Sequence, residues 1–258
     1  MSCIRILKND PFKVMLIICL LIVFFSQKNI NQQSCDQDAN ELIKKLSKKL
    51  THMAKKYGQL SCSLDKKVSL NGGWCSELSG KNSSEHITDV EIAKELSFYL
   101  RNKKVASFGD GPGLYKEIFI FLKDVQSYDA FDGAPFCEET SNNNVKFLDL
   151  TVPVYHLLPF DWIISLEVAE HIPKEYEDTY IDNLVRHARE GIIISWATPG
   201  QGGLSHLNEK DFEEVKSKLF QKGFQHLPQD SQRVREKSFL PWIQNNLNIF
   251  KRFSKFDS

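Results

Sequence analysis

The 258-residue sequence has no excess of charge of either sign, since 33 Lys and Arg residues balance 33 Asp and Glu residues. Without a net basic field, nothing draws the chain toward nucleic acid. Internal repeats, low-complexity tracts and RNA-binding signatures are also absent. No C-x-x-C pair or His/Cys spacing indicates zinc, so the sequence predicts no metal ligand. These absences argue against a repeat protein and a nucleic-acid binder.

The sequence also lacks a hydrophobic run of full membrane-spanning length near its N-terminus. Residues 14–25 form an unbroken apolar run of 12 residues, whereas a bilayer span needs about 20. The run has the length of a signal-peptide core. No small-x-small cleavage site follows, because Phe24 occupies the place of a small residue before Ser26. We therefore expect an uncleaved signal anchor over residues 14–26.

Basic residues precede this run, namely Arg5, Lys8 and Lys13. Their position favours a cytoplasmic N-terminus, with a short tail over residues 1–13. The rest of the chain would then face the lumen of the endoplasmic reticulum or Golgi, as a single-pass membrane protein of the secretory pathway. The alternatives are a cleaved signal peptide with secretion and, less favoured, a buried helix.

The cysteine count agrees with an oxidising lumen. Four cysteines lie beyond the hydrophobic run, and an even count with three possible pairings is expected where disulfides form: Cys35, Cys62, Cys75 and Cys137. The sequence also contains an N-glycosylation sequon, Asn82-Ser83-Ser84. The sequon has meaning only if the luminal interpretation holds, in which case the protein is a glycoprotein.

A polar, partly helical stem is predicted over residues 27–87. Within it, residues 41–57 would form a helix with lysines around one apolar stripe, made of Leu42, Leu46, Leu50 and Met53. A basic amphipathic helix can lie on a membrane or bind an acidic partner. We favour the interpretation that the stripe packs on the neighbouring domain. That domain would begin at residue 88, where the segment from Thr88 to Glu91 is a capping box that opens a helix.

The run from Val105 to Tyr115 is the most informative stretch of the domain. A short apolar strand pattern leads into a G-x-G-x-G turn made of Gly109, Gly111 and Gly113, and a helix is predicted over residues 114–122. Strand, glycine turn and helix together bring backbone close to a nucleotide-like ligand. By itself the motif is weak, because glycine turns also join strands to helices without a ligand.

Four further strands are predicted along the chain, over residues 125–133, 145–150, 160–167 and 191–196. Helical patterns lie between several of them, notably over residues 174–189, so we expect a parallel sheet covered on both faces. Ligands of such sheets bind at the carboxyl ends of the strands. The glycine turn and three acids would meet there: Asp132, Asp149 and Glu167. A helix and a last strand follow near the C-terminus, up to residue 253.

These features resemble the class I S-adenosylmethionine-dependent methyltransferases over roughly residues 88–253. The glycine turn, the acids after strands two and three, and the stretch from Glu167 to Ile172 match the superfamily's pattern. Residues 165–173 and 200–208 are more similar still to small methyltransferase-like proteins with an N-terminal membrane segment. The resemblance implies a Rossmann-like, doubly wound, mostly parallel seven-stranded sheet with an antiparallel last strand. It implies S-adenosylmethionine as the cofactor.

The resemblance also implies residue roles. The three glycines would pass beneath the methionine part of the cofactor. Asp132 would hold the ribose hydroxyls, with Asp129 as the alternative, and Glu167 would lie at the ligand edge. Asp149 would receive the adenine amino group while Leu150 packs on the ring. One position departs from the pattern, because Ser107 stands where many members have an acid; Asp110 partly replaces it.

Methyl transfer needs mainly alignment and, for an oxygen or nitrogen acceptor, a general base. His206, in the glycine-rich loop after strand five, and His171, just past strand four, are the candidate bases. The alternative is that each histidine hydrogen-bonds its own loop. Glu170 belongs to the ligand edge or caps the next helix. The loop over residues 197–203 can fold over the substrate, with Asn208 as the N-cap of a helix over residues 209–222.

The sequence therefore predicts methyl transfer to an unidentified acceptor, with a preference for a hydroxyl of a glycan, lipid or small metabolite. One alternative is a catalytically silent protein that binds a ligand or partner on an inherited fold. A nicotinamide-dependent oxidoreductase is a further alternative, and the residues from Glu167 to Pro173 match methyltransferases better.

Overall fold

The computed structural model describes residues 11–64, 67–75, 80 and 86–253, with side chains from residue 36 onward. It divides into two compact units, residues 1–46 and 47–258. In the described part of the chain, no helix is long and apolar enough to cross a membrane. The predicted anchor over residues 14–26 and the sequon at residues 82–84 lie outside the residues described in full. They remain predictions.

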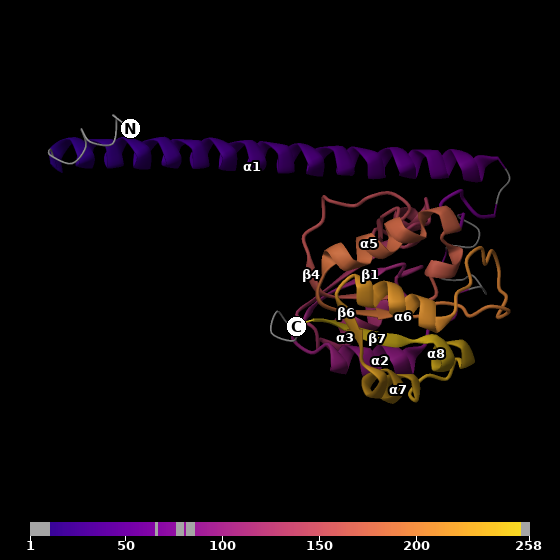
Figure 1. Cartoon of the computed structure of the whole chain (residues 1–258). Helices are drawn as coiled ribbons and strands as arrows, with labels where there is room; N and C mark the ends of the chain where they lie inside the picture. The colour runs from indigo at the N-terminus through magenta and orange to yellow at the C-terminus, as the bar shows by residue number, and fades with distance from the viewer. Residues whose placement is uncertain (1–10, 65–66, 76–79, 81–85, 254–258) are drawn as a thin grey trace. The chain divides into compact units, whose positions relative to one another are not determined.

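A seven-stranded sheet forms the centre of the second unit, with strand order β3-β2-β1-β4-β5-β7-β6 (Figure 1). Strands β1 to β5 pair in parallel, and β7 pairs antiparallel with both β5 and β6. The predicted mostly parallel sheet with an antiparallel last strand is thus confirmed. The strands are β1 (Lys104–Phe108), β2 (Ser127–Asp132), β3 (Lys146–Phe147), β4 (Phe160–Ser165), β5 (Ala188–Ile194), β6 (Phe224–His226) and β7 (Asn248–Arg252).

Helices cover both faces of the sheet, because alternate residues of each strand point to opposite sides. On one face, Val105 of β1 belongs to a core cluster that includes residues of α2, α3, α7 and α8. On the other face, Ala106 packs with residues of α5 and α6. The helices are α2 (Val90–Tyr99), α3 (Leu114–Leu122), α4 (Cys137–Thr140), α5 (Glu177–His187), α6 (Phe212–Gln221), α7 (Pro228–Arg235) and α8 (Pro241–Asn246), with 3-10 turns η2 (Ala169–His171) and η3 (Lys174–Tyr176).

Several predicted boundaries differ from those in the structure. The helix predicted over residues 174–189 is η3 followed by α5, and β5 begins at Ala188. The helix predicted over residues 209–222 begins only at Phe212, after Asp211. Asn208 is therefore not its N-cap; its side chain instead donates to Glu177 Oε2 at 2.9 Å. The N-cap of α2 is Asp89 rather than Thr88, because the Asp89 carboxylate accepts from the Ile92 N–H.

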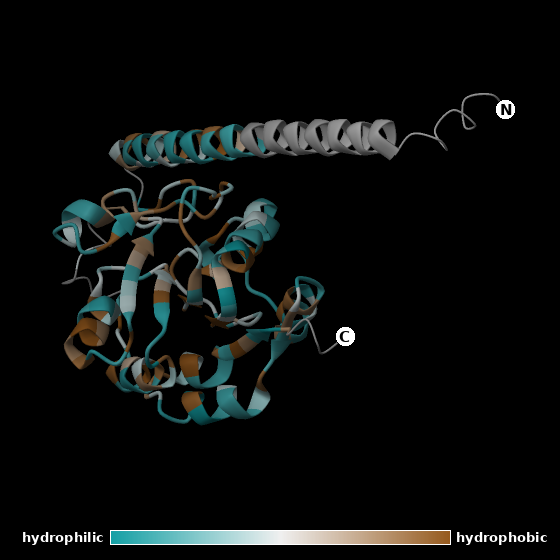
Figure 2. Cartoon of the chain, turned by 90° about the vertical axis from the view of Figure 1, so that its left-hand side faces the viewer, coloured by the Kyte–Doolittle hydropathy of each residue, from teal (hydrophilic) through white to brown (hydrophobic). Residues whose placement is uncertain are grey.

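The long helix α1 (Pro11–Ser63) packs by its small residues where it belongs to the second unit. Ser47 and Gly58 are buried, whereas Leu50 and Met53 are 40% and 56% exposed. Ser47 Oγ accepts from the Tyr155 N–H at 2.9 Å, and a small residue permits this approach. The prediction that the leucine stripe packs on the domain is therefore wrong for these residues. Figure 2 shows hydrophobic and hydrophilic residues interleaved along the described part of α1.

The second compact unit begins at Ser47, whereas the predicted domain begins at residue 88. A disulfide between Cys62, near the end of α1, and Cys75 joins the intervening segment to this helix. Cys137 is a buried free thiol, so it does not take part in the predicted pairing. Cys35 lies outside the residues whose side chains the structure describes. The segment that we predicted as stem thus belongs in part to the folded domain.

Candidate active site

A cavity of about 550 Å³ opens at the carboxyl ends of β1, β2 and β4. The strand order reverses direction between β1 and β4, and ligands of open α/β sheets bind at such a switch point. Gly109 and Gly111 of the turn after β1, Asp132 at the end of β2 and Glu167 after β4 all line the cavity, whereas Gly113 does not. The structure therefore brings these predicted residues together, although they are far apart in the sequence.

The glycine turn has a backbone that only glycine adopts without strain. Gly109, Gly111 and Gly113 have φ of +100°, +62° and +88°, in the left-handed region that side chains disfavour. A Cβ at Gly109 would lie 2.1 Å from Val168 Cγ2. The turn therefore passes close under the segment that follows β4, and its backbone forms one wall of the cavity.

Asp132 is held at the end of β2 by backbone donors. Its Oδ2 accepts from the Gly111 N–H at 2.8 Å, and its Oδ1 accepts from the Ala134 N–H at 2.7 Å. Burial raises the pKa of this carboxyl above its usual value. Asp129 is exposed and does not line the cavity, because residues three apart on a strand point to opposite faces. The structure therefore places Asp132, and not Asp129, in the lining of the cavity.

The remaining predicted cofactor residues divide into two groups. Leu150 and Asp110 line the cavity, whereas Asp149 and Ser107 do not. Asp149 is buried, and its Oδ1 accepts from the backbone N–H and the hydroxyl of Thr151 at 2.9 and 2.7 Å. The side chain of Asp149 is thus used within its own turn, because the chain folds back directly after β3. The predicted contact of Asp149 with the adenine amino group stays a prediction.

Asp110 is the acid that the structure offers in place of Ser107. Its carboxylate is buried, and Oδ1 accepts from the Tyr128 hydroxyl at 2.8 Å. Burial raises the pKa of Asp110 to about 7, although this hydrogen bond opposes the shift. Asp110 therefore changes its charge near neutral pH at the edge of the cavity.

Sequence reasoning missed one wall of the cavity, formed by the turn from Asn71 to Trp74. Asn71 Nδ2 donates to the Gly133 carbonyl at 3.0 Å. A Cβ at Gly73 would lie 2.2 Å from the same oxygen, so only glycine permits this approach. The disulfide at Cys75 directly follows the turn. The Gly-Gly pair before a tryptophan was the available signal, but it does not indicate which segment the turn meets.

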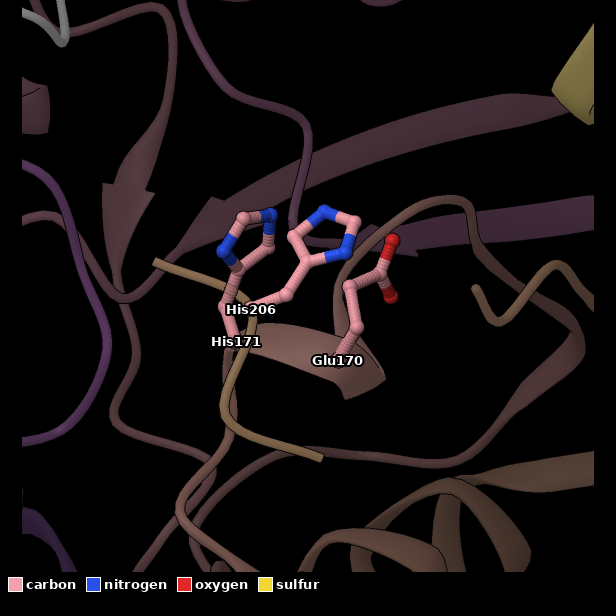
Figure 3. A group of neighbouring side chains, drawn as sticks. All are labelled: Glu170, His171 and His206. Atoms are coloured by element: carbon pink, nitrogen blue, oxygen red, sulfur yellow. The ribbon is translucent and has the colours of Figure 1, made fainter. Parts of the chain in front are cut away.

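Two histidines and a glutamate also gather in the lining of the cavity. Glu170 and His171 lie on η2, and His206 lies in the loop after β5. One ligand atom from each side chain lies within 4.8 Å of the others. Figure 3 shows the three side chains projecting the same way, with the His206 ring between the His171 ring and the Glu170 carboxylate in this view. The two ring centroids are 5.2 Å apart.

Backbone hydrogen bonds hold this cluster together. The N–H groups of Leu207 and Asn208 donate to the Glu170 carbonyl at 2.7 and 3.0 Å. These bonds join the loop that carries His206 to the turn that carries Glu170 and His171. The predicted histidines therefore meet in the cavity because of contacts that local sequence patterns do not encode.

Glu209 organises the glycine-rich loop, a role that no local sequence pattern indicates. Its carboxylate accepts from the N–H groups of Gly200 and Gly202, both at 2.7 Å. It also accepts from His206 Nδ1 at 3.1 Å. These bonds lower the pKa of Glu209, the bond from His206 most of all. A single carboxylate, that of Glu209, thereby positions both His206 and the glycine-rich loop.

The charges around this cluster are unusual. Both carboxylate oxygens of Glu170, and Oε1 of Glu167, are buried without a hydrogen-bond partner among the described residues. Burial, and then the nearby Glu167 carboxylate, raise the pKa of Glu170 well above its usual value. Burial and the His206 ring lower the pKa of His171 to about 4. No lysine or arginine is among the described residues that line the cavity.

Glu167 also has a strained backbone, with φ of +53° at a non-glycine residue. Its N–H donates to Ser195 Oγ at 2.8 Å, and its Oε2 accepts from Gln201 Nε2 at 3.3 Å. Such strain is kept where the surrounding structure fixes it, commonly at functional sites. The contacts with Ser195 and Gln201 hold Glu167 at the mouth of the cavity.

The sheet order, the antiparallel β7 and the cavity at the switch point together define a Rossmann-like α/β protein with a ligand-sized cavity at the carboxyl ends of its parallel strands. No protein-family model and no curated protein matches the sequence. The function of this chain is therefore inferred from its own cavity.

Solved structures of methyltransferases have a similar chain path at low identity. N-methyltransferase NodS from Bradyrhizobium japonicum WM9, in complex with S-adenosylhomocysteine, gives a TM-score of 0.48 at 12% identity, over 69% of this chain and 95% of NodS. Magnesium protoporphyrin IX methyltransferase from Synechocystis PCC 6803, with bound S-adenosylhomocysteine, gives 0.47 at 14%, over 64% and 83%. The Burkholderia thailandensis 1,6-didemethyltoxoflavin-N1-methyltransferase gives 0.43 at 20%, over 63% and 79%.

Proposed function

We propose that this chain is an S-adenosylmethionine-dependent methyltransferase. The observation that carries the proposal is the cavity itself, where a positive-φ glycine turn and Asp132 face one space at the sheet's switch point. Its volume, about 550 Å³, lies within the range of small-molecule sites. Asp132 would accept the ribose hydroxyls, the glycine turn would pass beneath the methionine part, and Leu150 would pack on the adenine.

The charge of the cavity favours this cofactor over a dinucleotide. Four acids line it, and the described lining holds no lysine or arginine to offset them: Asp110, Asp132, Glu167 and Glu170. A sulfonium cation gains from those carboxylates that are ionised, whereas the pyrophosphate of NAD finds no cationic side chain in the described lining. This sign of charge argues against a nicotinamide-dependent oxidoreductase.

The acceptor would enter the cavity beside His171 and His206. In the reaction, the acceptor oxygen bonds to the methyl carbon while the C–S bond breaks and its electron pair stays on sulfur. The proton of the hydroxyl must leave to a base. His206 can take this proton, because its ring lies in the cavity and is oriented through Nδ1 by Glu209. A hydroxyl of a glycan, lipid or small metabolite is therefore the acceptor class we propose.

The cellular setting is part of the proposal. The hydrophobic run over residues 14–25 with basic residues before it supports a membrane anchor. The Cys62–Cys75 disulfide supports an oxidising compartment. The proposed enzyme would thus act from the membrane toward acceptors in the secretory lumen.

The test is calorimetric titration of the full-length protein, in detergent micelles, with S-adenosylhomocysteine and with NAD. We expect micromolar binding of S-adenosylhomocysteine and none of NAD. Asp132→Ala should weaken binding by about 10- to 100-fold, the worth of hydrogen bonds to a charged group. Asp129→Ala is the matched control, because Asp129 is exposed on the same strand; it should leave binding unchanged.

Three outcomes would count against the proposal. A folded protein that binds no S-adenosylhomocysteine would exclude the enzyme. Equal losses in Asp132→Ala and Asp129→Ala would place the cofactor elsewhere. Binding without methyl transfer to any hydroxyl acceptor would favour the alternative of a catalytically silent, ligand-binding protein.

A further inference from the structure

We propose that Glu170, His171 and His206 bind a divalent metal cation in the cavity. Two imidazoles and a carboxylate supply a mixed nitrogen and oxygen donor set. Their ligand atoms already lie within 4.8 Å of one another. A small inward movement of the three side chains would bring them to coordinating distance around one ion.

The unpartnered carboxylate is independent support for a cation. Glu170 is fully buried, and neither of its oxygens has a partner among the described residues. Burying a carboxyl group without a partner costs free energy, and buried charges are usually paired or coordinate a metal. Glu167 adds a third unpartnered oxygen nearby, and no lysine or arginine of the described lining balances either acid. A divalent cation would supply the missing partner.

Both imidazoles are oriented as metal ligands commonly are. Nδ1 of His171 lies 3.3 Å from Ser205 Oγ, and Nδ1 of His206 lies 3.1 Å from Glu209 Oε1. An outer partner at one ring nitrogen fixes the tautomer and leaves the other nitrogen for the metal. In this arrangement Nε2 of each ring is the nitrogen that can bind the cation.

The cluster is also assembled before any ligand arrives. The two N–H bonds from Leu207 and Asn208 to the Glu170 carbonyl fix the loop against η2. The three donors thus come from two segments with a common backbone anchor, and a preorganised donor set binds metal more tightly than a loose one. First-row cations such as Mn²⁺, Co²⁺ and Zn²⁺ suit imidazole with carboxylate better than Mg²⁺ or Ca²⁺.

With a cation bound here, the two imidazoles would act as metal ligands and not as bases that remove a proton. Held by these three side chains, the cation would supply Lewis-acid chemistry at the acceptor hydroxyl and favour loss of the hydroxyl proton to water. The C–S electron pair then stays on sulfur as before. This extension rests on the proposed function, whereas cation binding does not. A nitrogen that holds the metal cannot also accept a proton, so the two tasks are exclusive for each ring.

The experiment starts from the full-length protein, stripped with EDTA and dialysed. Co²⁺ titration, followed by visible d–d absorption and calorimetry, should show one site. Mn²⁺ and Zn²⁺ should compete, and Mg²⁺ should compete poorly. His206→Ala and Glu170→Gln should each weaken Co²⁺ binding by more than about 100-fold, since even loss of an outer partner costs 10- to 100-fold. His52→Ala is the control, because His52 is exposed.

Glu209→Gln tests the outer partner separately. We expect about a 10-fold loss of Co²⁺ affinity with unchanged binding of S-adenosylhomocysteine, a combination that general unfolding would not produce. If a ligand variant fails to fold, nitrogen couplings in the electron paramagnetic resonance spectrum of the Cu²⁺-loaded wild type report imidazole coordination without any substitution.

The outcomes separate this inference from the proposed function. No Co²⁺ binding, binding that survives both ligand substitutions, or no imidazole coupling would overturn the cation site. S-adenosylhomocysteine binding in EDTA would meanwhile leave the proposed function standing. Co²⁺ binding without S-adenosylhomocysteine binding would keep the site and overturn the methyltransferase.

Discussion

The carboxylates beside the glycine turn and those beside the histidine cluster differ in the hydrogen bonds that they accept. Beside the glycine turn, Asp132 accepts two backbone N–H bonds and Asp110 accepts a tyrosine hydroxyl. Beside the histidine cluster, Glu170 has no partner at either oxygen among the described residues, and Glu167 lacks one at Oε1. The acids beside the glycine turn have hydrogen-bond donors in the folded chain, whereas the acids beside the histidine cluster have carboxylate oxygens that a ligand would have to pair.

The contrast follows from which backbone groups face the cavity. After β2 the chain turns so that its N–H groups point at Asp132, and the glycine turn contributes another. In η2 the Glu170 carbonyl accepts from Leu207 and Asn208, while its side chain lies beside the rings of His171 and His206. Backbone N–H groups provide the carboxylates beside the glycine turn with hydrogen-bond donors once the chain has folded. Imidazole lone pairs are acceptors, so they cannot provide donors to a carboxylate.

The largest effect on stability is expected for a substitution in the glycine turn. Gly109→Ala places a Cβ 2.1 Å from Val168 Cγ2 at φ of +100°, so strain and overlap should lower the free energy of unfolding by about 3 kcal/mol. Gly200→Ala is the control, since φ is +87° there but nothing lies within 4 Å of the added Cβ. It should cost about 1 kcal/mol. Urea unfolding measures both, and equal costs would mean that the contact with Val168 yields freely.

The second prediction is that replacing a carboxylate changes the free energy of unfolding in opposite directions at these two places. In EDTA, Asp132→Asn should destabilise the protein by about 2 kcal/mol, because it removes the charged acceptor of two N–H bonds. Glu170→Met should stabilise it by about 1 kcal/mol, because an unpartnered buried polar group is replaced by an apolar one of similar shape. Thermal unfolding of both variants beside the wild type gives the comparison. Changes of the same sign would show that the two places do not differ in this way.

A third prediction concerns pH and Asp110. Its carboxyl has an ordinary pKa of 3.8 but holds its proton in the folded state up to about pH 7. The folded state therefore binds more protons at Asp110 than the unfolded chain does between these pH values. The contribution of Asp110 to stability is thus greatest below about pH 4 and falls as the pH rises to about 7. Asp110→Asn should remove this part of the fall. Melting temperatures from pH 5 to 8 measure it, and parallel profiles would refute the assignment to Asp110.

The sequence was sufficient where the signal is local. Periodicity located strands β1, β2, β4 and β5, and glycine spacing located the turn, because backbone conformation there depends on neighbouring residues. Strand alternation alone could have chosen Asp132 over Asp129, since only one of them continues the face that meets the turn. The resemblance to methyltransferases supplied the antiparallel last strand, which no local pattern indicates.

What the sequence missed depends on contacts between distant segments. The face of α1 that packs is set by Ser47 meeting Tyr155, and hydrophobicity alone pointed to the opposite face. Glu209 looked like the first residue of a helix, although its carboxylate holds Gly200 and Gly202. The histidines were predicted singly, and only the folded chain shows that they share a cluster with Glu170.

The Cys62–Cys75 bond connects the cavity to the redox state of its surroundings. The turn from Asn71 to Trp74 is a wall of the cavity and immediately precedes Cys75. Reduction would release this wall from the end of α1, so ligand affinity becomes a function of thiol concentration as well as of ligand concentration. Protein made in a reducing cytosol would thus carry every residue of the site and still hold its ligands less tightly than protein made in an oxidising compartment.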